Sequence, residues 1–281
     1  MNVLKAEKKL AVLSALVEGS SIRSTERMTG VHRDTIMRLV LTLGESCQHL
    51  LDTKMQRLPC RLIQCDEIWT FVYVKQKRLN GAHNREEMGD QYVYVALDAE
   101  TKLIPCFRVG KRDPATTWYF IQDLQGRLAR RVQLTTDGFR AYIPAVEDAW
   151  GADVDFAQLI KVYEHNEAER ERYSPSDVVQ VVPTLVTGKP DRRYISTSYI
   201  ERQNLTLRMQ LRRFTRLTNA FSKKLSHLRA ALALHFAHYN FCRIHSTLRV
   251  TPAMAAGIAN EVWSLGQLLS QGQTPLHKEQ T

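Results

Sequence analysis

A run of β-branched and aromatic residues opens the α/β part of this chain: Leu62-Ile63-Gln64-Cys65-Asp66-Glu67-Ile68-Trp69-Thr70-Phe71-Val72-Tyr73-Val74. This composition is typical of a strand or a strand pair. Two acids, Asp66 and Glu67, stand in the middle of the run, and a buried carboxylate is costly unless it is paired or binds a metal. Because neighbouring side chains of a strand point to opposite faces, we expect one acid to serve a functional site and the other to be structural.

The residues that follow predict two more strands and then two helices separated by a strand. The strands span 91–98 and 103–109, and the short polar turn between them predicts an antiparallel hairpin. Asp113-Pro114 predicts a helix start with Asp113 as N-cap, and this helix should run to Arg130-Arg131. A strand at 132–136 then leads into a helix through Phe139 and Val146.

Asp137 stands at the carboxyl end of the strand 132–136. Ligand-binding groups gather at the carboxyl ends of strands in open α/β sheets, so Asp137 is a candidate for chemistry. The alternative is that Asp137 only caps the helix that follows, which is a common use of aspartate.

Positive charge is concentrated between Tyr199 and Val250. Ten bases less one acid give this segment +9 of the chain's net charge of +10. The single acid is Glu201, near the start of a predicted helix, where its basic neighbours favour ionisation and would also attract a polyanion such as DNA. Glu201 is therefore a candidate for a carboxylate that acts on nucleic acid together with a metal.

Other bases of the same segment include Arg212, Arg213, Lys223 and Lys224. Few acids stand nearby to pair with them, which favours a phosphate-binding surface over a simple solvated helix face. The segment also contains His227, His235, His238 and His245, but the apolar residues around them indicate core or surface histidines rather than a zinc site.

The first fifty residues predict three short helices. Apolar residues recur at helical spacing from Ala6 to Val17, a second helix should span 22–28, and a third begins near His32 after a turn at Thr29-Gly30-Val31. The turn resembles that of the helix-turn-helix family. In that interpretation the third helix would contact bases or phosphates through Arg33, Asp34, Thr35 and Arg38. The alternative is a three-helix packing unit with a solvated outer face.

These patterns predict how the chain is divided. We expect a helix-turn-helix domain at 1–50, a linker at 51–61, an α/β domain at 62–270 and a disordered tail at 271–281. A mobile insert with one possible strand would lie at about 164–198. No run of about 18 apolar residues could span a bilayer, so we expect a soluble cytoplasmic protein with no membrane partner. The five cysteines, odd in number and never spaced Cys-x-x-Cys, are expected to be reduced core thiols.

The three acids taken together resemble the DDE transposase and integrase group. That group carries an acid within the first strand, an acid ending the fourth strand and a glutamate early in a late helix. More narrowly, three stretches look like bacterial transposases of the first insertion-sequence family: Cys65-Asp66-Glu67-Ile68-Trp69, Thr136-Asp137-Gly138-Phe139 and Glu201-Arg202-Gln203-Asn204-Leu205-Thr206-Leu207-Arg208, which continues to Leu211-Arg212-Arg213-Phe214. Arg208 lies seven residues after Glu201, where such proteins carry Lys or Arg, and this spacing puts both on one helix face.

The resemblance implies an RNase H-like catalytic domain over residues 62–270, with a mixed sheet flanked by helices, after the all-α helix-turn-helix domain. It implies that Asp66, Asp137 and Glu201 are catalytic and bind Mg²⁺, for which Mn²⁺ could substitute, with two ions in each site. Their carboxylates should then converge to within about 4 to 8 Å. Arg208 would hold a terminal phosphate; its alternative is a solvated helix charge.

The implied function is a DNA transposase that cuts the ends of a mobile element and joins them to target DNA. Its partners would be the element ends and the target DNA, bound by a homodimer or larger assembly near the bacterial nucleoid. The alternative is a non-catalytic DNA-binding protein, either a regulator or a decayed transposase. A related nuclease, such as a junction resolvase, fits the spacing of Glu201 and Arg208 less well.

Overall fold

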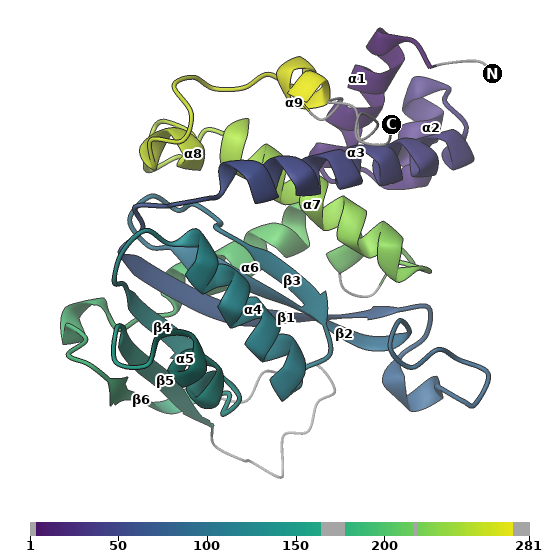
Figure 1. The fold of residues 1–281 in the computed structure, drawn as a ribbon. Helices are drawn as coiled ribbons and strands as arrows, with labels where there is room; N and C mark the ends of the chain where they lie inside the picture. The colour runs from purple at the N-terminus through teal and green to yellow at the C-terminus, as the bar shows by residue number, and fades with distance from the viewer. Residues whose placement is uncertain (1–3, 164–177, 216–217, 272–281) are drawn as a thin grey trace, which may run out of the picture.

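The computed structural model describes residues 4–163, 178–215 and 218–271. Figure 1 shows a twisted sheet covered by helices, with the N-terminal helices forming a further layer beside α7. The chain is thus of the predicted α/β class, with a mixed sheet and flanking helices that are consistent with an RNase H-like fold. Within the described ranges, no helix is both long and apolar enough to cross a lipid bilayer.

In the described residues the sheet has six strands, in the order β3-β2-β1-β4-β5-β6. Neighbouring strands are antiparallel from β3 to β1, parallel from β1 to β5, and antiparallel again between β5 and β6. The strands are β1 (Leu62–Val72), β2 (Gly89–Asp98), β3 (Phe107–Gly110), β4 (Gln133–Asp137), β5 (Asp155–Tyr163) and β6 (Val178–Thr187). The predicted antiparallel hairpin is confirmed as β2 and β3. The predicted order of three strands, a helix, a strand and a helix is also confirmed.

The two long edges of β1 have different neighbours. Along one edge, β1 pairs with β2 from Ile63 to Val72. Along the other edge it pairs with β4 only from Leu62 to Cys65, because β4 is much shorter. In the described part of the sheet, the later half of β1 therefore has one edge without a neighbouring strand, and this open edge begins at Asp66.

Helices cover both faces of the sheet. The helices α4 (Pro114–Arg127) and α5 (Tyr142–Trp150) pack together on one face. The helix α6 (Ser198–Gln210) lies on the other face, where the Gln64 side chain of β1 accepts hydrogen bonds from the backbone amides of Tyr199 and Ile200. Asp113 caps α4 as predicted, accepting from Thr116 N at 2.7 Å.

The N-terminal helices form at the predicted places. They are α1 (Ala6–Val17), α2 (Ile22–Thr29) and α3 (Arg33–Lys54). Ser21 caps α2, and Gly30 ends it with φ of 68°, a backbone conformation that glycine adopts without strain. These contacts account for the turn between α2 and α3, while its use in DNA recognition stays a prediction.

The joint predicted at 51–61 is more ordered than its polar sequence indicates. The helix α3 continues to Lys54, beyond the predicted boundary at residue 50, and Leu51, Met55 and Leu58 are buried. One hydrophobic cluster extends from α1 and α3 through α7 (Leu225–Phe241) to the sheet. The polar residues of this stretch are interspersed with these buried ones and are exposed or half-buried, so polarity alone was a poor guide.

The region predicted as an insert contributes to the sheet. Residues 155–163, before the predicted insert, form β5, which the sequence patterns did not predict. The one predicted strand of the insert is β6, at the sheet edge. The polar stretch 165–176 and the tail 272–281 lie outside the described residues. The remaining elements of the described residues are η1 (Gln76–Arg78), η3 (Arg192–Tyr194), η4 (Arg212–Phe214), α8 (Pro252–Ala255), which Thr251 caps, and α9 (Leu265–Gln271).

The contact between α3 and α7 depends on two small residues. A Cβ added to Gly44 would lie 2.4 Å from the Cα of Ala230. We therefore expect Gly44→Val to force α3 and α7 apart and to lower the free energy of unfolding by about 2 kcal/mol or more. Chemical denaturation of the two proteins would measure the difference.

A matched change on α4 serves as the control. Apart from its chain neighbours and the backbone of its own helix, no described atom lies within 4 Å of a Cβ built on Gly126, so Gly126→Ala should be neutral or stabilise by about 0.5–1 kcal/mol. Equal stabilities of Gly44→Val and wild type would show that the close approach of α3 and α7 does not exist in solution.

Candidate functional site

Three carboxylates converge where β1 extends beyond β4. One oxygen from each of Asp66, Glu67 and Asp137 lies within 4.8 Å of the others. Asp66 and Glu67 belong to β1, and Asp137 is the last residue of β4. Acids, histidines and cysteines are the side chains that could hold a metal ion, and within the described part of the chain these three acids form such a group. His227, His235, His238 and His245 form no such group there.

The expectation that only one of Asp66 and Glu67 faces the site is wrong. Their side chains do leave opposite faces of β1: Asp66 contacts Asn204 of α6, and Glu67 contacts Tyr142 of α5. Both carboxylates nevertheless reach the same place because the pairing of β4 with β1 stops at Cys65 and leaves the edge of β1 open from Asp66 onward. The alternation of side chains along a strand sets the face from which each side chain starts. At an open strand edge, however, two neighbouring carboxylates can still approach each other around the edge.

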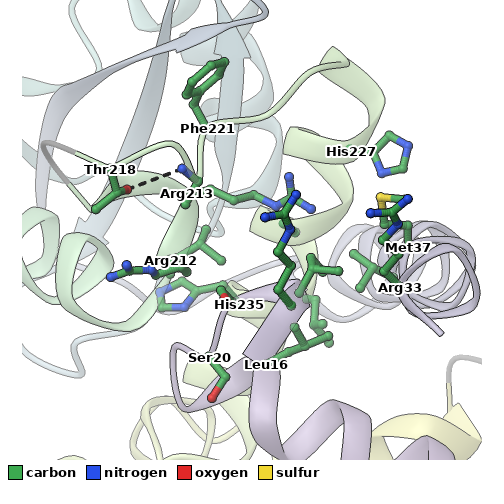
Figure 2. A pocket seen from close by; sticks show the side chains of 18 of the residues that line it. Leu16, Ser20, Arg33, Met37, Arg212, Arg213, Thr218, Phe221, His227 and His235 are labelled. Carbon is green, nitrogen blue, oxygen red and sulfur yellow. Dashed lines mark hydrogen bonds between the residues drawn. The ribbon is translucent and has the colours of Figure 1, made fainter. Parts of the chain in front are cut away.

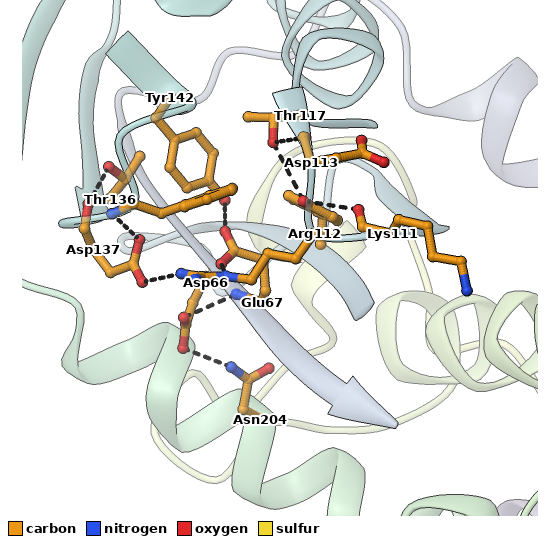
Figure 3. A network of polar contacts seen from close by, with 12 residues as sticks. Asp66, Glu67, Lys111, Arg112, Asp113, Thr117, Thr136, Asp137, Tyr142 and Asn204 are labelled. Atoms are coloured by element: carbon orange, nitrogen blue, oxygen red, sulfur yellow. Dashed lines mark hydrogen bonds and ion pairs between the residues drawn. The ribbon is translucent and has the colours of Figure 1, made fainter. Parts of the chain in front are cut away.

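Glu67 is held by two donors on the face that carries α4 and α5. The Tyr142 hydroxyl donates a hydrogen bond to Oε1, and Arg112 Nε donates to Oε2 at 3.0 Å (Figure 3). The Glu67 side chain is only 2% exposed. The same Arg112 guanidinium reaches Asp137 Oδ2 at 3.3 Å and lies 3.9 Å from the centre of the Phe139 ring. Arg112 therefore bridges two of the three acids and supplies positive charge to the cluster.

Asp66 is held from the other face of the sheet. Asn204 Nδ2 donates to Asp66 Oδ2 at 2.8 Å, and the backbone amide of Glu67 donates to Asp66 Oδ1 at 2.8 Å. These two bonds fix the orientation of the carboxylate, so the site depends on α6 being docked against β1.

Proximity and burial disturb the titration of both β1 acids. Burial, followed by the charge of Asp137, raises the pKa of Asp66 to about 6 and the pKa of Glu67 to about 7. The rise persists although Arg112, Tyr142 and Asn204 each favour the ionised forms. Burial and the nearby charge of Asp137 therefore disfavour the ionised forms of both acids, in spite of these contacts.

The donor atoms fit a hard divalent cation. Carboxylate and amide oxygens are the ligands that Mg²⁺ and Mn²⁺ prefer over sulfur. Asn204 Oδ1 is buried and has no hydrogen-bond partner among the described residues, although its amide nitrogen is bonded to Asp66. A cation or its bound water beside Asp66 would satisfy this oxygen and offset the repulsion among the acids.

Glu201 lies on α6, three residues before Asn204, but outside the group of three acids. Its Oε1 accepts from Lys161 Nζ and from Thr197 Oγ1, each at 2.5 Å, and the side chain is 42% exposed. Its charge contributes to the raised pKa of Asp66, so the two carboxylates interact. Glu201 thus borders the cluster on the α6 side, while its carboxylate is engaged elsewhere.

The predicted DNA-binding residues occupy two regions. Arg33 and Arg38 are exposed and Thr35 is half-buried at the start of α3, and Arg208 is half-buried on the last turn of α6. Arg33 also lines one cavity together with Arg212, Arg213, Lys223 and Lys224, so bases from distant parts of the sequence meet there.

Four residues of the site were not found from the sequence: Arg112, Tyr142, Lys161 and Asn204. Asn204 had a usable signal, because a polar residue three positions after Glu201 shares its helix face. Arg112, Tyr142 and Lys161 meet the acids only through folding, and their local sequence gives no sign of it.

No protein-family model matches this chain, and no curated protein sequence matches it. Three similar solved structures belong to two transposases. The Mos1 transposase paired-end complex with left transposon end is 15% identical with a TM-score of 0.24, over 56% of this chain and 60% of that chain. The piggyBac transposase synaptic complex with hairpin DNA is 12% identical with a TM-score of 0.42, over 97% and 72% of the two chains. The Mos1 strand transfer complex is 14% identical with a TM-score of 0.25, over 84% and 78%.

This chain spans about three fifths of the length of the Mos1 chain in the paired-end complex.

The raised pKa of Glu67 predicts how stability changes with pH. The ordinary pKa is 4.5 and the folded value is about 7, so the folded protein binds more protons than the unfolded chain between these values. The free energy of unfolding should therefore fall as pH rises from 4.5 to 7. In Glu67→Gln the decrease in the free energy of unfolding between pH 4.5 and 7 should be smaller by about 2 kcal/mol. The share of the decrease that comes from Asp66 should remain.

Urea denaturation at a series of pH values would measure this slope. Glu147→Gln, which removes an exposed acid from α5, is the matched control for loss of one carboxylate. The same slope in wild type and Glu67→Gln would contradict the prediction.

Proposed function

We propose that this chain is a DNA transposase that cleaves the ends of a mobile element and joins them to target DNA by metal-dependent phosphoryl transfer. The proposal is carried by the convergence of Asp66, Glu67 and Asp137 at an open strand edge against α6. The net charge of +10 and the sequence motifs around Asp66, Asp137 and Glu201 support the choice of DNA as substrate.

Asp66 and Asp137 would hold two Mg²⁺ or Mn²⁺ ions together with Glu201, and Glu67 is a further oxygen donor within the cluster. Such ions, when bound, activate an attacking water or DNA 3′-hydroxyl and stabilise the leaving oxygen. No covalent intermediate with the protein is needed in such a reaction.

The surrounding residues would keep these carboxylates in position. Asn204 orients Asp66, while Tyr142 and Arg112 fix Glu67 on the opposite face. Arg112 also balances the charges of Glu67 and Asp137, which lets the acids stay close before DNA binds. This preorganisation is what catalysis at phosphorus requires of a protein.

The basic residues would bind the DNA. Arg33, Thr35 and Arg38 would contact the element ends if α2 and α3 act as a helix-turn-helix. Arg212, Arg213, Lys223 and Lys224 would hold backbone phosphates, and Arg208, on the same helix as Glu201, would hold a terminal phosphate. Joining two element ends to one target calls for at least two copies of the chain, so we propose a homodimer or larger assembly on DNA.

A second candidate function is a non-catalytic DNA-binding protein, either a regulator or a decayed transposase. It is favoured by the contacts of Glu201, whose carboxylate is bound by Lys161 and Thr197 rather than grouped with Asp66 and Asp137. In this case the basic residues would bind DNA and the acids would have no catalytic role.

Nicking of DNA that carries the element ends would separate the two functions. We expect cleavage in Mg²⁺ or Mn²⁺ by wild type, and a loss of at least 100-fold in Asp66→Asn, Asp137→Asn and Glu201→Gln, because each change removes a charged metal ligand. Glu147→Gln, on the surface of α5, should cut as wild type does. If all three variants cut as well as wild type, the catalytic assignment would fail.

The bases and Glu201 should have separable effects on DNA affinity. Replacing Arg212 and Lys224 with alanine should weaken DNA binding and reduce the slope of log affinity against log salt by about 2, because each lost phosphate contact releases about one counterion fewer. Glu201→Gln should bind DNA at least as well as wild type. Binding isotherms at several salt concentrations would test this, and an unchanged slope in the double variant would refute phosphate contacts at these positions.

A further inference from the structure

A cavity of about 920 Å³ lies between the N-terminal helices, the segment after α6, and α7. Figure 2 shows side chains from all three parts of the chain around it: Leu16, Ser20, Arg33 and Met37; Arg212, Arg213, Thr218 and Phe221; and His227 and His235. Its volume lies in the range of cavities that enclose a small organic ligand, and it is too small for a DNA duplex.

The charge of this cavity is strongly positive. It is lined by Arg23, Arg33, Arg212, Arg213, Lys223 and Lys224, and by no acid of the described residues. Arg213 is the most constrained of these bases: burial lowers its pKa to about 10, and its Nη1 donates to the uncharged Ser222 Oγ at 3.0 Å. Arg213 is half-buried, and a guanidinium withdrawn from water without a carboxylate beside it is costly, so a bound anion would offset that cost.

A second, independent feature indicates a ligand with a polar group of a different kind. His235 lines the cavity, is only 5% exposed, and its Nε2 has no hydrogen-bond partner among the described residues. Burial lowers the pKa of His235 to about 3, so the ring is neutral. Its Nε2 can therefore donate or accept one hydrogen bond with an uncharged group of a ligand. Apolar side chains, among them Val17, Val40 and Leu234, form much of the remaining wall.

A ligand that suits all three features has an anionic group, a flat apolar body and a polar edge. A nucleotide has these properties: a phosphate for the arginines and lysines, and a base whose faces are apolar and whose edge forms hydrogen bonds. We propose that this cavity binds one unpaired nucleotide, with its phosphate held by the basic residues and its base in the apolar part beside His235.

The cavity is connected to the strand that carries the acids. The backbone amide of Tyr73, just after β1, donates to Ser222 O at 2.9 Å, and Phe221 packs on Phe71 of β1 with ring centres 4.5 Å apart. Phe71 lies five residues after Asp66, which is about 17 Å along a strand. A DNA strand that crosses the acid cluster can therefore also place a nucleotide in the cavity.

The nucleotide can come from the end of a DNA strand or from free solution. The first source rests on the proposed function, since it makes the cavity a holding site for an unpaired DNA end. The second source needs no transposase activity. Both share the chemistry of phosphate and base, and the experiment has an arm for each.

DNA binding without divalent ions would test the proposal, because it does not depend on catalysis. Fluorescence anisotropy in EDTA would compare a blunt duplex with the same duplex carrying a three-nucleotide single-stranded overhang. We expect the overhang to bind at least 10-fold more tightly to wild type. His235→Leu should reduce this preference to less than 3-fold, because leucine keeps the volume of the side chain but removes the hydrogen-bonding nitrogen.

His238→Leu is the matched control, since His238 lies on the same helix but does not line the cavity. It should keep the preference for the overhang. Circular dichroism and thermal unfolding would show whether both variants fold, and if His235→Leu does not, His235→Gln would replace it. In the second arm, deoxyadenosine monophosphate would be titrated into wild type without DNA, and thermal unfolding would be followed.

Preference for the overhang that depends on His235 supports a site for a DNA end. A site for a free nucleotide is supported if deoxyadenosine monophosphate raises the midpoint of thermal unfolding of wild type but not of His235→Leu, and if wild type shows no preference for the overhang. Neither effect in wild type, or a preference that His235→Leu leaves unchanged, overturns the proposal. Because nicking is measured separately, wild type can lack the overhang preference and still cut DNA, so the two proposals can fail independently.

Discussion

The repulsion among Asp66, Glu67 and Asp137 is the interaction on which the arrangement of the site depends. Three carboxylates within 4.8 Å of one another cannot all stay charged and buried without nearby compensation. The fold supplies part of it from both faces of the sheet, through Arg112 and Tyr142 on one side and Asn204 on the other. Burial, followed by the charge of Asp137, nevertheless raises the pKa values of Asp66 and Glu67, and a divalent cation would offset the cost of keeping these acids ionised.

This arrangement follows from a difference in strand length. The pairing of β1 with β4 stops at Cys65, whereas its pairing with β2 continues to Val72. The resulting open edge lets acids from both faces of β1 meet the acid that ends β4. The packing of α6 against β1 completes the site, and α7 links it to the N-terminal helices through one continuous core. The acid cluster and the N-terminal helices are therefore joined by packed elements rather than by a flexible joint.

The sequence predicted most of the elements, and its failures have physical causes. Strong local signals gave β1, the β2–β3 hairpin, the capped start of α4 and the three N-terminal helices. β5 was missed because Phe156, Ala157 and Gln158 are all buried, so this strand has no alternating pattern. The buried Gln158 is satisfied by the carbonyls of Asp137 and Phe139, which lie far away in the sequence. Leu51 and Met55 were assigned to a linker because the helix they extend is recognisable only once α3 is packed.

By itself the sequence determined which groups are available: acids within one strand and at the end of another, Glu201 in a basic segment, and a glycine turn between two N-terminal helices. These are local properties, set by residue identity and by spacing of a few positions. The tertiary structure decided which groups meet. It brought Glu67 into the cluster, placed Arg112 between two acids, bonded Asn204 to Asp66, and gathered bases from α3 and from the segment after α6 around His235. Such contacts depend on strand register and helix packing, which are fixed by burial across the whole chain and cannot be read from neighbouring residues.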